Sequence, residues 1–376
     1  MQYIIGLFLL LTLNVFAVSD MSTVDDRSFA LKQATYNWNT NWNKHIVPYN
    51  ELLSGGPPKD GIPPIDKPKF IGVKEAKSWI KDKEPVVFVK INNEVKAYPI
   101  QILIWHEIVN DTLGGKKVSV TFCPLCNSTI VFDRVLNGRT YDFGTSGLLR
   151  NSDLVMYDRQ TQSLWQQFTG EAIIGDLTNM SLTMLPSSMI SFKDYYTKYP
   201  NGLVLSKDTG NTRAYGSNPY VGYDDVDNSP FLYSNPMDKR LKPMQRVVTI
   251  AKKDLAKAYT YKTLQIKKVL NDTFAGMEIV VMHKSGTTSA LDKRSISRSK
   301  DVGATAVFSS ILEGQRLEFK YDKYNGIIDT QTNSRWNIFG EAISGKFKGK
   351  ILNQIVHADH FWFSWAAFKP NTIIYK

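Results

Sequence analysis

Two cysteines and one histidine are the residues of this chain best suited to act together chemically. Cys123 and Cys126 are its only cysteines, and the two residues between them make a Cys-Pro-x-Cys knuckle that directs both sulfurs at one point. His106 lies 17 residues before Cys123. Two thiolates and an imidazole suit copper or zinc, which accept sulfur and nitrogen ligands. We therefore predict a copper or zinc ion held by Cys123, Cys126 and His106.

A tetrahedral ion needs one ligand more than these three. Candidates for the fourth position are His357, His360, Met156 and an open position. A polar stretch after the knuckle contains Arg150, Asn151 and Asp153. These three could bind a small polar cofactor or substrate beside the metal, or they could cap a turn.

Two other uses of the cysteines are open. A disulfide inside the knuckle would stabilise little, because it closes a very short loop, yet it forms readily outside the cytoplasm. The protein would then be a non-catalytic binding or scaffold module with a structural disulfide. A thiol–disulfide oxidoreductase is the other alternative, although a thioredoxin-like site needs a helix after the first cysteine. Here residues 128–132 read as a strand.

The knuckle is expected to join two strands. Val118, Val120 and Phe122 alternate with polar residues, which is the period of a half-buried strand. The apolar run at 130–132 then indicates a second strand. Asn127, directly after the second cysteine, tolerates the left-handed backbone that such a tight turn requires.

Several short segments recur in the same order in two parts of the chain. The matching pairs are VKAY at 95–98 with AKAY at 256–259, VNDTLGG at 109–115 with LNDTFAG at 270–276, TQSLW at 161–165 with TNSRW at 332–336, and GEAIIG at 170–175 with GEAISG at 340–345. Ordered matches of this kind indicate an internal duplication. We predict a mainly β, α+β protein with few short helices, built from two copies of one sandwich-like or barrel-like module at 86–205 and 247–376.

The second copy lacks the candidate site. Its residues at the positions of His106, Glu107, Cys123 and Cys126 are Lys267, Lys268, Lys284 and Thr287. Residues shared by both copies are best explained by the fold, and residues present in one copy are candidates for function. The first module is therefore expected to carry the site, and the second to be a degenerate copy.

The remaining segments predict where the protein is located and how the chain is divided. Residues 1–17 resemble a secretory signal peptide, with a short apolar core and a cleavage site at Val15-Phe16-Ala17; an uncleaved N-terminal anchor is the alternative. No later segment is long and apolar enough to be a transmembrane helix. Residues 18–85 are expected to be an N-terminal arm and 206–246 a linker. We expect an extracytoplasmic protein, periplasmic or secreted.

Composition limits the classes of partner. The net charge of +11 is spread along the chain rather than gathered into a basic block interleaved with aromatic residues, so we expect no nucleic-acid partner. No phosphate loop, dinucleotide fingerprint, nucleophile elbow or zinc-protease motif is present. A small-molecule or redox partner fits the cysteine knuckle, and the sequence does not specify which.

With these segments in view, the chain resembles the Domain of Unknown Function 3179 family of uncharacterised secreted prokaryotic proteins. The resemblance covers most of the mature chain. It rests on WHEIVND at 105–111, CPLC at 123–126, SGLLRNSD at 146–153 and FWFSW at 361–365. The family name implies no activity and no catalytic residues, so the chemistry is argued from the residues themselves.

Overall fold

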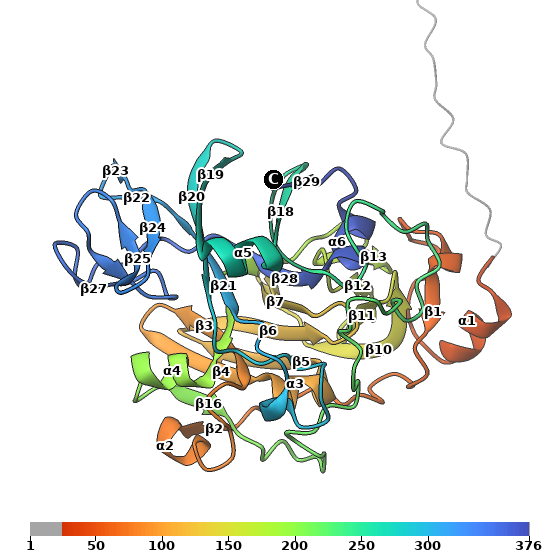
Figure 1. Ribbon diagram of the computed structural model, residues 1–376. Helices are drawn as coiled ribbons and strands as arrows, with labels where there is room; N and C mark the ends of the chain where they lie inside the picture. The colour runs from red at the N-terminus through yellow and green to blue at the C-terminus, as the bar shows by residue number, and fades with distance from the viewer. Residues whose placement is uncertain (1–24, 376) are drawn as a thin grey trace, which may run out of the picture.

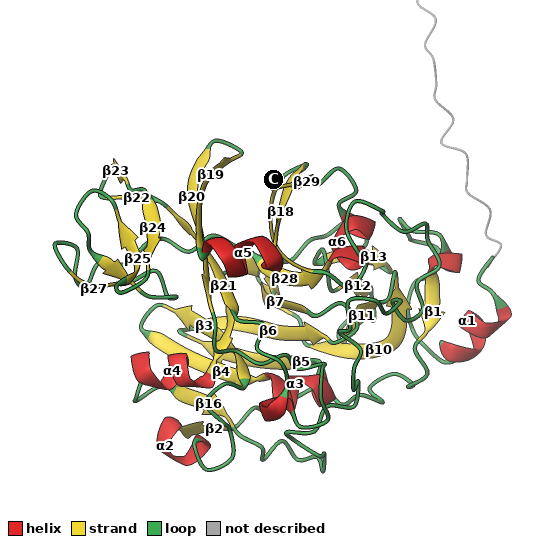
Figure 2. Cartoon of the chain, viewed as in Figure 1, coloured by secondary structure: helices red, strands yellow, loops and turns green. Residues whose placement is uncertain are grey.

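The computed structural model describes residues 25–375, which form a mainly β protein of several sheets with few short helices (Figures 1 and 2). The predicted signal peptide, residues 1–17, lies outside the described residues. The prediction of a mainly β protein is confirmed. None of the sheets between residues 25 and 375 closes as a barrel, so the barrel-like alternative is wrong.

The first half contains three larger sheets and the two-stranded sheet β8-β9. Its elements are β3 (Pro85–Ile91), β4 (Glu94–Pro99), α3 (Ile100–His106), β5 (Ile108–Leu113), β6 (Lys116–Cys123), β7 (Ser128–Asp133), β8 (Val135–Leu136), β9 (Arg139–Thr140), β10 (Phe143–Arg150), β11 (Asp153–Asp158), β12 (Leu164–Gln166), β13 (Glu171–Ile174), β14 (Thr183–Leu185), β15 (Ser188–Ser191), α4 (Phe192–Lys198) and β16 (Leu203–Leu205). The sheet orders are β1-β10-β11-β12-β13, β14-β7-β6-β5 and β15-β3-β4-β16-β2. The central sheet, which contains β6 and β7, carries the knuckle.

The N-terminal residues add strands to two of these sheets. Their elements are α1 (Phe29–Ala34), the short 3-10 helix η1 (Tyr49–Glu51), β1 (Leu52–Ser54), β2 (Phe70–Gly72) and α2 (Val73–Ala76). β1 pairs with β10, and β2 pairs with β16. The segment predicted to be an arm therefore completes the sheets of the first half.

The second half follows the same order of elements with one strand fewer. Its elements are β17 (Arg246–Lys252), β18 (Leu255–Thr260), α5 (Tyr261–Lys267), β19 (Val269–Phe274), β20 (Met277–Lys284), η2 (Ile296–Arg298), β21 (Ala304–Ser309), β22 (Ile311–Leu312), β23 (Gln315–Arg316), β24 (Phe319–Asp322), β25 (Gly326–Asp329), β26 (Arg335–Trp336), β27 (Ala342–Ser344), β28 (Ala358–Phe361), α6 (Trp362–Phe368) and β29 (Ile373–Ile374). In Figure 1 the sheet of β10 to β13 lies at the right and that of β24 to β27 at the left. These two sheets thus lie on opposite sides of the molecule in this view (Figure 1).

The segment between the halves, residues 206–245, contains no helix and no strand other than an isolated bridge. It is nevertheless held firmly to the second half. Asp224 is buried, and its carboxylate forms ion pairs of 2.9 Å with both Arg246 and Lys300. The linker is therefore packed against the second half at Asp224.

Burial around the knuckle differs from the expected pattern. Val118, Val120 and Phe122 are buried as the alternation predicts, but Ser119 and Thr121 between them are buried as well. Alternation alone predicts a strand with one wet face. β6 instead has β5 and β7 paired to its two edges, and the side chains on both of its faces are buried. The knuckle at its end is accordingly deep inside the protein.

No helix within residues 25–375 is both long enough and apolar enough to span a bilayer.

Gly147 is a point where β10 and the N-terminal segment approach closely. It has a φ of +76°, and an added Cβ would lie 2.0 Å from the backbone oxygen of Pro57. A backbone carbonyl cannot move away as a side chain can, so Gly147→Ala is expected to lower the free energy of unfolding by roughly 3 kcal/mol or more. Urea denaturation measures this loss.

Gly115→Ala is the matched control for this substitution. Gly115 has a φ of +81°, and its added Cβ would have no neighbour within 4 Å. It should lose only about 1 kcal/mol, the cost of the left-handed backbone alone. Equal losses for the two variants would show that the contact between β10 and Pro57 does not constrain the fold.

Candidate metal centre

The knuckle is a tight turn between two central strands. β6 ends at Cys123 and β7 begins at Ser128. The backbone N–H of Asn127 donates to the carbonyl of Pro124 at 3.1 Å, and Asn127 has a φ of +50°. The left-handed conformation expected for Asn127 is confirmed. It turns the chain within four residues, so that both cysteine side chains leave the same end of the sheet.

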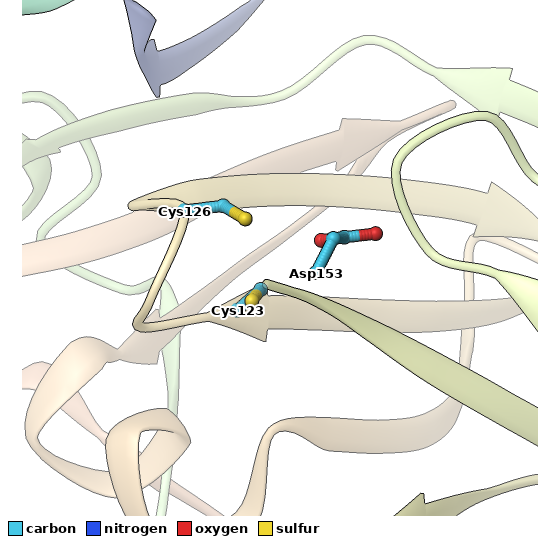
Figure 3. Close-up of side chains that lie close together, drawn as sticks. All are labelled: Cys123, Cys126 and Asp153. Atoms are coloured by element: carbon cyan, nitrogen blue, oxygen red, sulfur yellow. The ribbon is translucent and has the colours of Figure 1, made fainter. Parts of the chain in front are cut away.

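An aspartate from another sheet completes a cluster with the two sulfurs. Both sulfurs and one carboxylate oxygen of Asp153 lie within 4.8 Å of one another. Figure 3 shows the Cys126 side chain pointing toward the Asp153 carboxylate. All three residues are buried, and both cysteines are free thiols. Within residues 25–375, no other group of three or more His, Cys, Asp or Glu residues gathers its ligand atoms in this way.

A two-residue hairpin turn delivers Asp153 to the sulfurs. Arg150 and Asp153 pair at the ends of β10 and β11, and the turn between them consists of Asn151 and Ser152. Both turn residues have positive φ, 53° and 67°, as a type I′ hairpin requires. The Ser152 carbonyl faces the knuckle, 3.8 Å from Sγ of Cys123 and 3.6 Å from Sγ of Cys126. This hairpin end is therefore packed directly against the thiols.

The two oxygens of Asp153 have different surroundings. Oδ2 accepts hydrogen bonds from Gln166 Nε2 at 2.6 Å and from the backbone N–H of Phe168 at 3.0 Å. Oδ1 is buried and receives no hydrogen bond from nitrogen or oxygen, so that the two thiols, which lower the pKa of Asp153, are its polar neighbours. Gln166 is itself oriented, because its Oε1 accepts from Arg150 Nη1 at 3.4 Å. Oδ2 is thus held in place while Oδ1 is left available to a ligand.

Burial suppresses ionisation of every acidic group at the cluster. It raises the pKa of Asp153 to about 7. Burial, with a smaller contribution from the nearby Asp153 carboxyl, raises the pKa of Glu107 to about 8. Burial also raises the pKa of Cys123, and that of Cys126 well above its ordinary value. Neither carboxyl forms an ion pair with a Lys, Arg or His anywhere between residues 25 and 375. Four acidic groups therefore share one interior region without a protein cation.

Glu107 links this region to a large cavity. It follows α3, where it caps the helix with a φ of +59°. Its side chain and Leu125, inside the knuckle, both line a cavity of about 820 Å³. Most of the lining is apolar or aromatic, and the linker contributes Tyr220 and Tyr223 to it. The cavity therefore lies beside the cluster, and Glu107 is the only Asp, Glu, Lys, Arg or His in its described lining.

The second half of the chain closes the cluster from behind. The backbone N–H of Phe361 donates to the carbonyl of Cys126 at 2.9 Å. Ser364, on α6, is close enough for its side chain to lower the pKa of the Cys126 thiol. Phe361 and Phe363 belong to the same hydrophobic core as the two cysteines. Residues from both halves and the linker thus surround the site.

The model of the family described as Protein of unknown function (DUF3179) matches residues 59–372. The chain belongs to this family. The match covers both halves and the linker, so the resemblance inferred from the sequence is confirmed. Comparison with curated proteins and with solved structures gave no match.

His106 is the predicted ligand that the structure of this DUF3179 chain does not bring to the sulfurs. Its Nδ1 lies 2.6 Å from the carbonyl oxygen of Pro63, and its Nε2 lies 2.7 Å from the hydroxyl of Tyr215. A carbonyl only accepts, so Nδ1 donates and Nε2 accepts from Tyr215. Both ring nitrogens are used, and His106 is outside the cluster.

The three residues predicted to bind a small polar ligand, Arg150, Asn151 and Asp153, make their contacts in three different places. Arg150 donates to Glu51 at 2.6 Å and reaches Asp153 only through Gln166. The Asn151 side chain accepts from Asn235 of the linker. Of the three, only Asp153 lies beside the thiols, where it is a candidate metal ligand. The turn-cap alternative describes Asn151 better than ligand binding does.

Several residues near the site were given no chemical role from the sequence. Glu107 had one available signal, its replacement by Lys268 in the second half. Tyr220 and Tyr223 stand in a segment that resembles a solvated linker, and only the tyrosine content of that segment hinted at burial. Gln166 and Ser364 had no signal, because their roles depend on contacts between distant segments.

Proposed function

We propose that this DUF3179 protein binds a zinc ion through Cys123, Cys126 and Asp153. The observation that carries the proposal is the burial of these groups together, with Asp153 Oδ1 unpartnered and no protein cation beside them. A buried carboxylate that has no cation beside it and one unpartnered oxygen is costly. A divalent cation would remove that cost and allow the thiols to lose their protons, because a metal ligand must be deprotonated to bind.

The ligand set favours zinc over copper. Zinc accepts sulfur at about 2.3 Å and carboxylate oxygen at about 2.0–2.2 Å, which places tetrahedral ligand atoms roughly 3.5–3.8 Å apart. The ligand atoms of the cluster lie within 4.8 Å of one another, so a small contraction would suffice. Copper(I) prefers soft sulfur ligands to a carboxylate. Copper is therefore the second choice, and metal analysis distinguishes the two.

Three protein ligands leave one position of a tetrahedral ion for water or a substrate, as in catalytic zinc sites. The cavity of about 820 Å³ beside the knuckle offers room for a substrate. In the metal-free protein burial raises the pKa of Glu107 to about 8. This buried carboxyl lines the cavity and could donate a proton to a molecule there. This combination favours a metal-dependent enzyme over a purely structural zinc protein.

The alternative chemistries receive less support. An oxidoreductase needs a thiol whose pKa is lowered, whereas burial raises the pKa of both thiols here. A disulfide clip would leave Asp153 Oδ1 buried without a partner. The location proposed for the protein is extracytoplasmic, on the basis of the signal-like residues 1–17, and a bound metal would protect the thiols from oxidation there.

We also infer that the two halves derive from one duplicated module. Asp158 accepts hydrogen bonds from Thr161 and from Trp165 Nε1, and Asp329 accepts the same bonds from Thr332 and Trp336.

The packing between the halves is reciprocal as well, since β28 packs against β7 and β15 packs against β21. In the second half Lys284 stands at the end of β20, where the first half has Cys123, and it forms an ion pair with Asp194. The second half thus has a lysine at the position where the first half has Cys123, a proposed metal ligand.

Metal content distinguishes the proposed ligands from the one predicted by sequence. Wild-type protein, loaded with zinc and desalted, is expected to retain about one equivalent, and Asp153→Asn should retain almost none. His106→Gln is the matched control and should retain the wild-type amount, because His106 lies outside the cluster. Plasma mass spectrometry measures the content. Retention by Asp153→Asn together with loss by His106→Gln would overturn this ligand assignment.

A further inference from the structure

A second cavity lies at the seam between the two halves and has a composition unlike the first. Its volume is about 170 Å³. The first half contributes residues of β7 and β14 together with Phe168, and the second half contributes residues of β17, β28 and α6. A cavity of about 150 Å³ is known to hold benzene. The seam cavity is therefore the size of one ring, and apolar side chains make up most of its walls.

One histidine in this wall has an unused hydrogen-bonding group. His360 is 1% exposed and packs against the rings of Phe168 and Trp365, at centroid distances of 4.3 and 5.3 Å, and those two rings also contact each other. Its Nδ1 is enclosed and has no hydrogen-bond partner. Burial alone lowers its pKa to about 3, so the ring is neutral and no hydrogen bond offsets that shift. An enclosed lone pair is tolerated better than an enclosed N–H, so we assign the proton to Nε2 of this cavity-lining residue.

The other histidine in the wall is already satisfied. Nδ1 of His357 lies 2.8 Å from the carbonyl of Ile355, and Nε2 lies 3.4 Å from the hydroxyl of Ser188. His357 is therefore a structural part of the wall. Of the two histidines in the described lining, only His360 has a ring without a hydrogen-bond partner.

The charge of the cavity is positive. Lys369 follows α6 and lines the cavity, and it is half-buried. Within residues 25–375 it has no carboxylate partner, and none of the residues lining the cavity is Asp or Glu. An ammonium and a neutral N–H donor at an apolar cavity are complementary to one anionic group on an apolar body.

Another cavity, which is also lined by residues of both halves, can be compared with the seam cavity. It has a volume of about 260 Å³ and is lined by Phe339, Lys198 and Glu341. Phe339 follows Trp336 by three residues, as Phe168 follows Trp165. Lys198, the last residue of α4, forms an ion pair with Glu341. Lys198 of this cavity is thus neutralised by Glu341, whereas Lys369 of the seam cavity has no carboxylate partner among the described residues.

We propose that the seam cavity binds a small monocarboxylate with a ring-sized apolar body, its carboxylate held by Lys369 and by Nε2 of His360 and its ring between the apolar walls. This site is separate from the proposed zinc ligands. It does not require that a metal be bound.

Calorimetry with benzoate tests the proposal on the mature protein, both metal-free and zinc-loaded. Benzoate should bind with a stoichiometry of one, and benzyl alcohol, which has the ring without the charge, should bind roughly ten-fold or more weakly. Lys369→Met and His360→Phe should each weaken benzoate binding by about ten-fold, the effect of losing one charge-assisted hydrogen bond. Lys198→Met should change it by less than about two-fold, because Lys198 is outside the cavity.

Three outcomes would overturn the proposal. They are no heat of binding from benzoate at millimolar concentration, equal affinities for benzoate and benzyl alcohol, and unchanged affinity in Lys369→Met. Lys369 is half-exposed, so its variant should fold even if His360→Phe does not. Failure of zinc binding with benzoate binding intact would contradict the metal proposal alone.

Discussion

Zinc is expected to raise the unfolding temperature of the metal-free wild-type protein and to leave that of Cys123→Ser unchanged. A ligand that binds only the folded state stabilises it by mass action, by about 2.7 kcal/mol when its free concentration is 100 times the dissociation constant. For a chain of this length that corresponds to roughly 4 °C. Cys123 supplies one of the three proposed ligands, and it is buried beside the other two. Circular dichroism melting with zinc and with chelator measures the difference.

The control for this experiment is His106→Gln, which should respond to zinc as the wild type does. Cys123→Ser replaces a sulfur with an oxygen of similar shape, so the variant should fold. If reductant, rather than zinc or chelator, shifts the wild-type transition, the disulfide alternative is the better explanation of the knuckle.

The metal-free protein is expected to lose stability as the pH rises. Burial raises the pKa of Glu107 from 4.5 to about 8 and that of Asp153 from 3.8 to about 7. The folded protein therefore keeps protons that the unfolded chain releases, and its stability falls between the unfolded and the folded pKa values. The two groups together should cost roughly 6 kcal/mol of stability between about pH 5 and pH 8, since one unit of pKa corresponds to about 1.4 kcal/mol.

Glu107→Gln tests the origin of that pH dependence. Glutamine keeps the shape and cannot ionise, so urea denaturation of this variant should show a much smaller decline over the same pH range. Glu51 is a suitable control position, because its carboxylate pairs with Arg150 near the surface. An equal decline in wild type and Glu107→Gln would mean that Glu107 is not the buried proton carrier.

Local sequence patterns predict the elements around the knuckle well. The strand before Cys123, the strand after Cys126 and the left-handed Asn127 all follow from alternation, apolar run and turn chemistry. Those properties depend on neighbours within a few residues. The mainly β fold is predictable for the same reason.

The composition of the cluster depends on contacts that no local pattern records. Asp153 reaches the sulfurs because the Asn151–Ser152 turn places the end of one sheet against another. His106 turns away because Pro63 and Tyr215, from the N-terminal segment and the linker, occupy both of its ring nitrogens. Sequence proximity to a cysteine was therefore misleading. His106 has no counterpart in the second half, but that fact does not distinguish a metal ligand from a residue that binds the linker.

The linker was also difficult to interpret from composition. Its Asn, Asp and Pro content is typical of solvated loops, yet Asp224 is buried in an ion-pair network and Tyr220 and Tyr223 line the cavity beside the cluster. Tertiary packing decides which face of such a segment is covered. Composition averages over both faces and does not reveal it.

X-ray absorption at the zinc edge of the zinc-loaded wild-type protein tests the central claim most directly. The cluster of Cys123, Cys126 and Asp153 predicts two sulfur neighbours at about 2.3 Å and oxygen neighbours at about 2.0–2.2 Å. Asp153→Asn should lose this spectrum, whereas His106→Gln should retain it. A zinc ion surrounded only by nitrogen and oxygen, or a protein that takes up no zinc with both thiols reduced, would contradict the account.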